Sequence, residues 1–219
     1  METDAFTATD IEAQYLSRGR TGGIVFVLSG PAGVGKDTVI AELLRIGDRL
    51  QKVVTVTSRK PRKGESHGHP YKFVDEAEFG EMAASGKFLE WAEVHGNLYG
   101  TPVDEVRDIL RANNDCILKI DVQGAAQIRR LIADAVHIFI GPPSIASLRE
   151  RLSNRGLDNE ASLRRRATDA ESELLSLPSY DYVVVNVDDA VKETAQQVRS
   201  IIEAERSRVG RRKMEIQHG

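Results

Sequence analysis

The strongest constraint on the fold is a glycine-rich loop between a predicted strand and a predicted helix. Residues 24–29, IVFVLS, form an apolar run rich in β-branched residues, typical of a strand buried on both faces of a parallel sheet. The pattern G-x-x-x-x-G-K follows, from Gly30 to Lys36. Such a loop leaves backbone N–H groups free to surround phosphates, and the helix N-terminus adds positive partial charge. This segment therefore predicts an α/β fold that binds a nucleotide triphosphate.

The residue after Lys36 departs from the usual loop pattern. A Ser or Thr normally stands there because its hydroxyl ligands Mg²⁺, whereas this chain has Asp37 followed by Thr38. A carboxylate is also a good Mg²⁺ ligand, and an acid in the first turn of a helix is stabilised by the helix dipole. Both roles stay open for Asp37. The predicted ATP-binding residues are Gly30, Pro31, Ala32, Gly33, Val34, Gly35, Lys36, Asp37 and Thr38, with Asp37 and Thr38 as candidate metal ligands.

Strands and helices alternate along the chain. Strands are predicted at 24–29, 52–58, 116–121, 136–141 and 182–186. The helices between them carry apolar stripes: Val39, Leu43 and Leu44; Ile128, Leu131 and Ile132 in a helix from Gln123; Ile145, Leu148 and Leu152 after the cap Ser144; and Val191, Ala195, Val198 and Ile202. Repeated βα units imply a parallel sheet with helices on both faces. The predicted fold class is α/β, with a P-loop NTPase core.

Two regions interrupt this alternation. Residues 59–101 contain short strand-like pieces around one helix and predict a small mixed α/β insertion, whereas the Arg-rich segment 149–168 around Gly156 predicts a helical lid. The predicted division is an N-terminal extension at 1–22, core segments at 23–58, 102–148 and 169–208, the insertion at 59–101, the lid at 149–168 and a C-terminal tail at 209–219.

Composition excludes several classes of protein. Thirty Lys and Arg against 33 Asp and Glu give a net charge of -3, so no global basic field favours nucleic acid or a membrane surface. The single Cys116 excludes an internal disulfide framework and a cysteine-rich zinc site. No apolar run approaches the length of a membrane span, and residues 1–22 lack the apolar core of a signal peptide. We expect a cytoplasmic protein.

Six segments, in this order, resemble the guanylate kinase family: SGPAGVGKD, TSRKPRKGE, GHPYKFV, FLEWAEVHGNLYGT, KIDVQGA and YDYVVVN. The similarity runs from about Ile24 to about Arg206. It implies Mg²⁺-dependent transfer of a phosphoryl group from ATP to GMP, in a fold of core, GMP-binding insertion and lid. The expected partners are therefore GMP and ATP, without nucleic acid or membrane, and either a monomer or a homodimer fits.

The insertion contains residues suited to the GMP phosphate. Arg59 and Arg62 can clamp a dianionic phosphate with planar bidentate donors, and Tyr71 and Tyr99 can each add a hydroxyl. The resemblance makes these four residues the phosphate contacts. Two arginines near a loop would otherwise be interpreted as solvated surface residues.

A carboxylate can read guanine, because guanine presents N1–H and its N2 amine as adjacent donors. The resemblance assigns this role to Glu90, and it assigns hydroxyl contacts with the base to Thr55 and Thr101. Adenine lacks the second donor and would leave the carboxylate unpaired. Thr101 has an alternative role, since TPVDE also has the pattern of a helix start with Thr as its N-cap.

The lid and the strand ends complete the predicted site. By resemblance, the lid arginines that neutralise the transferring phosphoryl group are Arg151, Arg155 and Arg166, and Asn186 lies near adenine. The remaining arginines of this region, Arg149, Arg164 and Arg165, are consistent with an ordinary charged helix face. Asp121 ends a predicted buried strand, where acids serve Mg²⁺ or its waters, and is assigned to the GMP side. Lys119 stands where many family members have an acid; it shares a strand face with Asp121 and can pair with it.

No general base is required, because the GMP phosphate is largely ionised at neutral pH, with a second pKa of about 6. His67, His69 and His95 are therefore interpreted as loop or surface residues. The predicted catalytic set is Lys36, Arg59, Arg151, Arg155 and Arg166. Two rival classes are a non-catalytic guanylate-kinase-like interaction module and a sugar-phosphate kinase. The first typically lacks the loop lysine, and the second does not need the guanine-reading residues.

Overall fold

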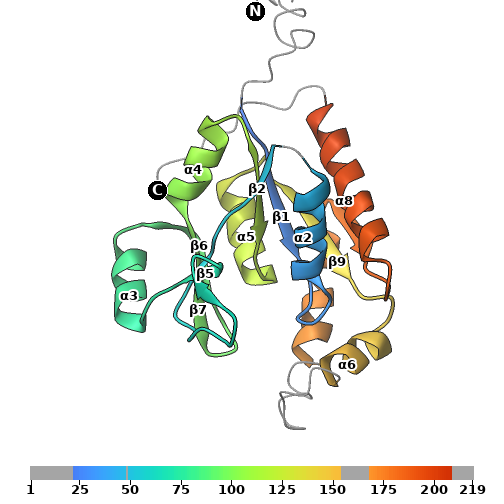
Figure 1. The fold of residues 1–219 in the computed structure, drawn as a ribbon, viewed down its shortest axis with the longest axis horizontal. Helices are drawn as coiled ribbons and strands as arrows, with labels where there is room; N and C mark the ends of the chain where they lie inside the picture. Colours follow the sequence, from blue (N-terminus) through green and yellow to red (C-terminus); the bar gives the residue numbers. More distant parts are fainter. Residues whose placement is uncertain (1–21, 48, 154–167, 209–219) are drawn as a thin grey trace, which may run out of the picture.

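The computed structural model describes residues 22–47, 49–153 and 168–208, apart from the side chain of residue 152. The predictions for Arg155, Gly156 and Arg164 to Arg166 in the lid lie outside these residues, as do those for most of the N-terminal extension and for the tail. The described chain forms two sheets (Figure 1), a central one with helices on both sides and a smaller one beside it.

The central sheet has five parallel strands in the order β10-β9-β1-β8-β2. They are β1 (Val25–Ser29), β2 (Leu50–Lys52), β8 (Asp115–Lys119), β9 (Val136–Gly141) and β10 (Tyr182–Val185). Helices connect each parallel strand to the next one along the chain, as the repeated βα units predict. The predicted fold class is confirmed.

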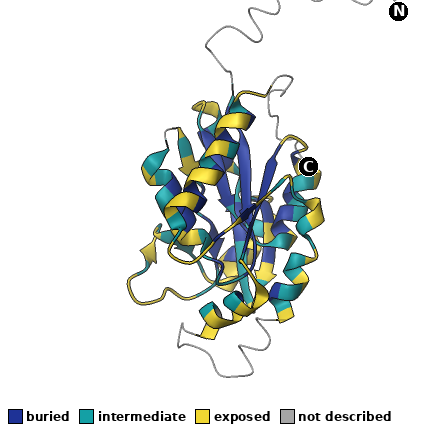
Figure 2. Ribbon diagram, turned by 90° about the vertical axis from the view of Figure 1, so that its right-hand side faces the viewer, coloured by how far each residue is buried: buried dark blue, intermediate teal, exposed yellow. Residues whose placement is uncertain are grey.

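Burial on both faces of β1 explains its apolar sequence. Successive side chains of a strand point to opposite faces, so Phe26 and Leu28 pack in one core with α2 (Lys36–Ile46) and α8 (Val191–Arg206). Val25 and Val27 pack in a second core with α4 (Val103–Arg111) and α5 (Val122–Leu131). Figure 2 shows the strands buried between helices whose outer faces are exposed.

The smaller sheet carries the predicted insertion. Its order is β4-β5-β3-β7-β6, and its strands are β3 (Val56–Thr57), β4 (Ser66–His67), β5 (Pro70–Phe73), β6 (Phe88–Val94) and β7 (Asn97–Pro102). Helix α3 (Glu76–Ala84) packs on it through buried Phe79, whose ring centroid lies 4.6 Å from that of Phe88.

The predicted single strand at 52–58 is wrong. The chain forms β2 up to Lys52 in the central sheet, and β3 begins at Val56 in the smaller sheet. Between them, the N–H of Val54 donates to the Glu105 carboxylate of α4 at 2.7 Å. Val53, Thr55 and Val56 are all buried across this passage, so periodicity does not reveal where the chain passes from one sheet to the other.

The helices follow the predicted stripes with two exceptions. In α8 the residues Ala195, Val198 and Ile202 are buried, as predicted. Leu131 and Ile145, however, are 42% and 41% exposed, because each lies at an end of its helix. Helix α6 (Ile145–Ser153) is capped as predicted, with the N–H of Ser147 donating to Ser144 Oγ at 3.0 Å. Residues 168–174 are also helical. No helix in the described ranges is both long and apolar enough to cross a membrane.

Candidate active site

The glycine-rich loop lies at the carboxyl end of β1 and opens α2, as predicted. Gly30 has φ +140°, and a Cβ there would lie 2.1 Å from the carbonyl oxygen of Ile140. Gly35 has φ +95°, and its Cβ would meet Asn186 Nδ2 at 2.5 Å. Only glycine fits both positions without displacing its neighbours. The loop therefore keeps the backbone close-packed while α2 presents its N-terminus to a ligand.

Lys36 is folded over this loop. Its Nζ donates to the carbonyl oxygens of Gly30 and Pro31, the latter at 3.0 Å. Burial lowers the pKa of Lys36 to about 8, against the opposing effect of the Glu173 carboxylate. A partner of opposite charge would offset the cost of burying this ammonium, and the role of Lys36 in binding phosphate stays a prediction.

Two predicted residues, Asn186 and Arg151, donate hydrogen bonds to the backbone of the glycine-rich loop. The side-chain amide of Asn186 donates to the carbonyl of Val34 at 2.7 Å and accepts from Thr194 Oγ1 at 3.0 Å. Arg151 donates to the carbonyls of Val34 and Asn186 at 3.3 and 2.8 Å, and to Asp188 at 2.8 Å. Arg151 is thus brought to the phosphate loop, and Asn186 has a structural role there. Its contact with adenine stays a prediction.

Lys119 pairs with a different acid from the one that strand alternation favours. Its Nζ lies 2.6 Å from Asp37 Oδ1 and donates to the Tyr71 hydroxyl at 2.7 Å. Burial alone would lower the pKa of Lys119, but Tyr71 and Asp37 outweigh it and raise that pKa. For Asp37, burial would raise the pKa, and Lys119 outweighs it and lowers that pKa. The predicted pairing of Lys119 with Asp121 is wrong, because Asp121 turns to α5.

Asp121 is the N-cap of α5. Its carboxylate accepts from the N–H of Gly124 at 2.9 Å and from Gln123 Nε2 at 3.0 Å. The cap satisfies one of the free N–H groups of the helix start. Asp121 therefore has a structural role at the strand end, and its contact with substrate or metal waters stays a prediction.

Three of the four predicted phosphate contacts, Arg59, Tyr71 and Tyr99, lie together at the smaller sheet. The guanidinium of Arg59 lies 5.4 Å from the centroid of the Tyr71 ring, and the Tyr99 ring is 5.8 Å from it. Glu65, which the sequence patterns did not single out, binds Arg59 at 3.0 Å and accepts from the N–H of Arg62 at 2.8 Å. A carboxylate thus stands beside the two arginines, where the prediction places a phosphate. The side chain of Arg62 itself is exposed.

Glu90 is a buried carboxylate that contacts Thr101. Only 4% of Glu90 and 1% of Thr101 is exposed, and Thr101 Oγ1 donates to Glu90 Oε1 at 2.5 Å. Burial raises the pKa of Glu90 to about 7, and the Asp121 charge adds to it. The alternative role of Thr101 as a helix cap is wrong, because Thr101 lies in β7 and Pro102 precedes α4 without a side-chain cap. The Thr101 hydroxyl is used by Glu90 instead.

The strand that carries Glu90 docks on the core. Gln127 of α5 bonds the backbone of Trp91, donating to its carbonyl at 2.8 Å and accepting from its N–H at 3.4 Å. At Gly124 a Cβ would lie 2.4 Å from Glu90 Oε2. A glycine in the first turn of α5 therefore makes room for the carboxylate. Thr55 is also buried, where the chain enters the smaller sheet.

Sequence patterns did not identify Glu173. It lies in the helical segment 168–174, and its Oε2 is buried without a hydrogen-bond partner. Burial raises the pKa of Glu173 to about 7, against the opposing effect of Lys36. Nothing in the local sequence signals this position, because it depends on how the helix packs against the loop.

The three predicted surface histidines, His67, His69 and His95, are exposed, as expected.

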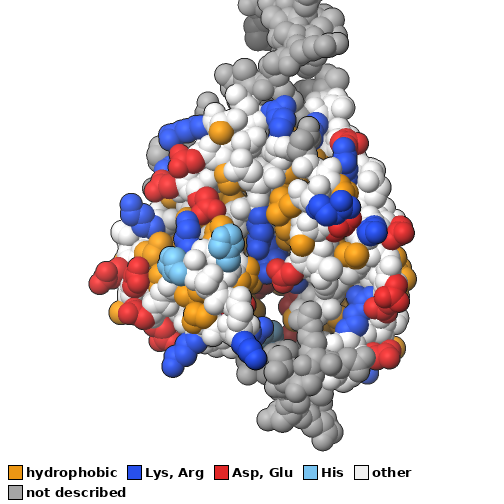
Figure 3. Space-filling model, in the orientation of Figure 1, with side chains coloured by type: hydrophobic (Ala, Val, Ile, Leu, Met, Phe, Trp, Pro, Cys, Tyr) orange, Lys and Arg blue, Asp and Glu red, His pale blue; other side chains and the backbone are white. Residues whose placement is uncertain are grey.

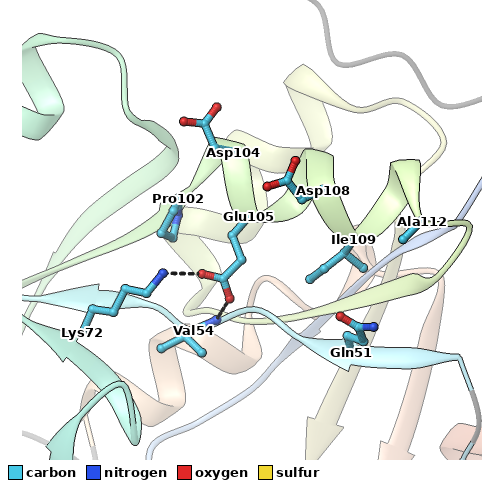
Figure 4. A pocket seen from close by; sticks show the side chains of 9 residues that line it. All are labelled: Gln51, Val54, Lys72, Pro102, Asp104, Glu105, Asp108, Ile109 and Ala112. Atoms are coloured by element: carbon cyan, nitrogen blue, oxygen red, sulfur yellow. Dashed lines mark hydrogen bonds and ion pairs between the residues drawn. The ribbon is translucent and has the colours of Figure 1, made fainter.

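The face that holds these residues is hollowed between the smaller sheet and the core, and Lys and Arg side chains gather along its middle (Figure 3). A separate open cavity of about 690 Å³ lies where α4 meets the chain between the two sheets. There the Lys72–Glu105 ion pair, at 2.7 Å, and the Val54–Glu105 bond tie the smaller sheet to α4 (Figure 4). This cavity contains none of the predicted site residues.

The phosphate loop, the parallel sheet and the facing second sheet define a P-loop nucleotide kinase. A family model described as guanylate kinase matches residues 23–205. The guanylate kinase of Shouchella clausii is 44% identical over 85% of this chain and 90% of its own length, and that of Nitrosomonas europaea is 46% identical over 83% and 90%. The crystal structure of guanylate kinase from Anaplasma phagocytophilum superposes with a TM-score of 0.73 at 35% identity, over 88% of this chain and 90% of that one. The chain belongs to the guanylate kinase family.

Proposed function

We propose that this protein transfers the γ-phosphoryl group of ATP to GMP. The observation that carries the proposal is the buried Glu90 carboxylate, held by Thr101 on the sheet that faces the phosphate loop. A carboxylate with a raised pKa and a single hydroxyl partner is an unusual group to bury. Guanine would supply two donors to it.

Base selection follows from this carboxylate. The guanine N1–H and N2 amine would donate to Glu90, and the bonds would offset the cost of burying its charge. Adenine offers an acceptor at N1 and no amine at C2, so AMP would leave the ionised carboxylate with no donor besides Thr101. Thr55 and Thr101 would contribute hydroxyls to the base edge. GMP is therefore the acceptor that this pocket favours.

The phosphates would meet between the two sheets. Arg59, Tyr71 and Tyr99 would hold the GMP phosphate, with Arg62 closing over it, while Lys36 and the loop N–H groups hold the ATP phosphates. A GMP phosphate oxygen forms a bond to the γ-phosphorus as its bond to the β,γ-bridging oxygen breaks, and the electron pair leaves with ADP. The chain orients the two phosphates in line and reduces their repulsion. Arg151, together with Arg155 and Arg166, would stabilise the transferring group.

The residues at the loop fit a bound Mg²⁺. The Asp37 side chain is 71% exposed and the neighbouring Thr38 is also exposed, so both oxygens can reach a cation beside the phosphates. Within the described ranges, no group of three His, Cys, Asp or Glu could hold a metal. Mg²⁺ usually takes one or two protein ligands and fills its shell with phosphates and waters. When bound, it would neutralise charge on the transferring phosphoryl group.

The same proposal includes the three-part division, with an insertion at 59–101 and a lid at 149–168 that close over the core. The cytoplasmic location and the choice between monomer and homodimer stay predictions.

The deciding experiment is a coupled assay with ATP and Mg²⁺ against GMP, AMP, CMP and UMP. We expect ADP and GDP from GMP at a rate at least 100-fold above that with AMP, of the order of known discrimination by buried polar groups. Equal turnover of AMP, or no GDP, would refute the proposal.

A further inference from the structure

The two residues that depart from the family pattern form an ion pair with each other. Asp37 stands where the loop pattern usually has a hydroxyl, and Lys119 stands where the resemblance implies an acid. They are 82 positions apart in the chain, yet Lys119 Nζ lies 2.6 Å from Asp37 Oδ1. Asp37 without Lys119 would leave an unpaired negative charge beside the phosphate loop, and Lys119 without Asp37 an unpaired positive charge. The two opposite charges neutralise each other.

Lys119 lies at the junction of three segments. It is the last residue of β8, Asp37 is in the first turn of α2, and its other partner, Tyr71, is in β5 of the smaller sheet. The ammonium is 4.9 Å from the centroid of the Tyr71 ring, and the lysine side chain is only 9% exposed. The residue thus joins the ATP loop of the core to the proposed GMP-phosphate cluster of the insertion.

The two partners hold this ammonium unequally. Asp37 is 71% exposed, so solvent weakens its attraction, and its carboxylate can turn away to a metal or water. Tyr71 is only partly exposed and packs edge-on against Tyr99 at 5.8 Å. An ammonium has three N–H donors, of which the bonds to Asp37 and Tyr71 use two. One donor remains for a ligand oxygen, and a second becomes free when Asp37 turns away.

We propose that Lys119 is an additional phosphate-binding residue of this kinase, which contacts the GMP phosphate beside Tyr71 while Asp37 balances its charge in the free protein. The inference rests on the proposed function, because it names a further ligand for the same acceptor. Lys119 and Arg59 both lie against the Tyr71 ring, at 4.9 and 5.4 Å from its centroid, so Lys119 adds positive charge where the GMP phosphate would bind. An acid at this position has no such attraction for a phosphate dianion.

The test is GMP binding measured by calorimetry without ATP or Mg²⁺, for the wild type, Lys119→Met and Lys72→Met. Lys72 is a matched control, because it also makes a 2.7 Å ion pair from the smaller sheet, with Glu105, but lies outside the site. A hydrogen bond to a charged group is worth about 1.5–3 kcal/mol, so we expect Lys119→Met to weaken GMP binding roughly 10- to 100-fold. Lys72→Met should leave it unchanged.

A purely structural role for the Asp37–Lys119 pair predicts a different pattern. Lys119→Met would then lower the urea midpoint but bind GMP within about twofold of the wild type, and that result would overturn the inference while the proposed function stands. If Lys119→Met fails to fold, Lys119→Gln with the same titration replaces it, and equal affinity again overturns the inference. A wild type that binds no GMP would overturn both the inference and the proposed function.

Discussion

Replacing Glu90 with Gln should stabilise the free protein while weakening its GMP binding. Glutamine has the same shape and still accepts from Thr101 Oγ1, but it carries no charge to bury. In the wild type, burial raises the pKa of Glu90 from 4.5 to about 7. Above that pH the folded protein must hold an ionised carboxylate that the unfolded chain would solvate freely.

The size of the effect follows from proton linkage. Because the folded pKa is raised, the carboxyl group favours folding below its ordinary pKa, and this contribution is lost as the pH rises towards the folded value. A shift of about two and a half pKa units corresponds to roughly 3 kcal/mol by about pH 8, and to less than about 1 kcal/mol near pH 4.5. Glu90→Gln should therefore raise the melting temperature by about 6 to 12 °C at about pH 8.

The assay is urea unfolding of the wild type, Glu90→Gln and Glu93→Gln at several pH values from about 4.5 to 8. Glu93 is a matched control, because it lies on the same strand with an exposed side chain. Glu173 has a raised pKa as well, but it is present in all three proteins and its contribution cancels in their differences. The difference in free energy of unfolding between Glu90→Gln and the wild type should increase with pH. The difference between Glu93→Gln and the wild type should not change with pH.

GMP binding should move in the opposite direction. The amide can accept one of the two guanine donors, and its own N–H₂ then faces the other, so affinity should fall about 100-fold. In the wild type, GMP affinity should also weaken below about pH 7, because protonated Glu90 cannot accept both donors. If Glu90→Gln is no more stable than wild type at about pH 8, burial of the ionised Glu90 carboxylate does not destabilise the folded protein, and the prediction is refuted. Unchanged GMP affinity would separately refute its role in reading guanine.

Three further substitutions test the rest of the site. Glu65→Gln should release Arg59 and tighten GMP binding about two- to fivefold in calorimetry; weaker binding would mean that Glu65 orients the arginine instead. Gly124→Ala should displace the Glu90 carboxylate and weaken GMP binding at least about tenfold, with binding of a non-hydrolysable ATP analogue unchanged. ATP affinity should fall as the pH rises above about 8, because phosphates require the charged form of Lys36, and Lys36→Met should bind weakly at every pH. A pH-independent wild type would contradict that account.

The central sheet could be predicted because its determinants are local. Four of the five strands, β1, β8, β9 and β10, contain short apolar runs, and the loop after β1 has a pattern whose glycines the backbone requires at Gly30 and Gly35. Cap chemistry at Ser144 is equally local.

The passage from β2 to β3 could not be predicted, because Val53, Thr55 and Val56 are all buried across it and the sequence pattern shows no interruption. Backbone bonds distant in sequence mark where the chain leaves the core, from Val53 to Ile117 in the central sheet and from Lys72 to Thr55 in the smaller one.

The residues of the candidate site could be named from the motifs, but their partners could not. Thr101 has the pattern of a helix cap, and only the approach of β6 turns its hydroxyl to Glu90. Glu65 ends one of the six family segments without a predicted role, and Glu173 lies in none of them; the importance of both comes from the charges that the fold places beside them. Hydrogen-bond partners distant in sequence depend on tertiary packing, which local patterns do not encode.

The amino-acid sequence by itself determined the α/β class, the phosphate loop, and the arginines, tyrosines and carboxylate suited to a guanine nucleotide. It also marked Asp37 and Lys119 as departures, each puzzling when considered alone. Only the tertiary structure decided that they belong together, because the parallel packing of β1 and β8 brings the end of one strand beside the first turn of α2. Charge balance is a property of three-dimensional neighbours, so two departures in the sequence become one ion pair between the proposed nucleotide sites.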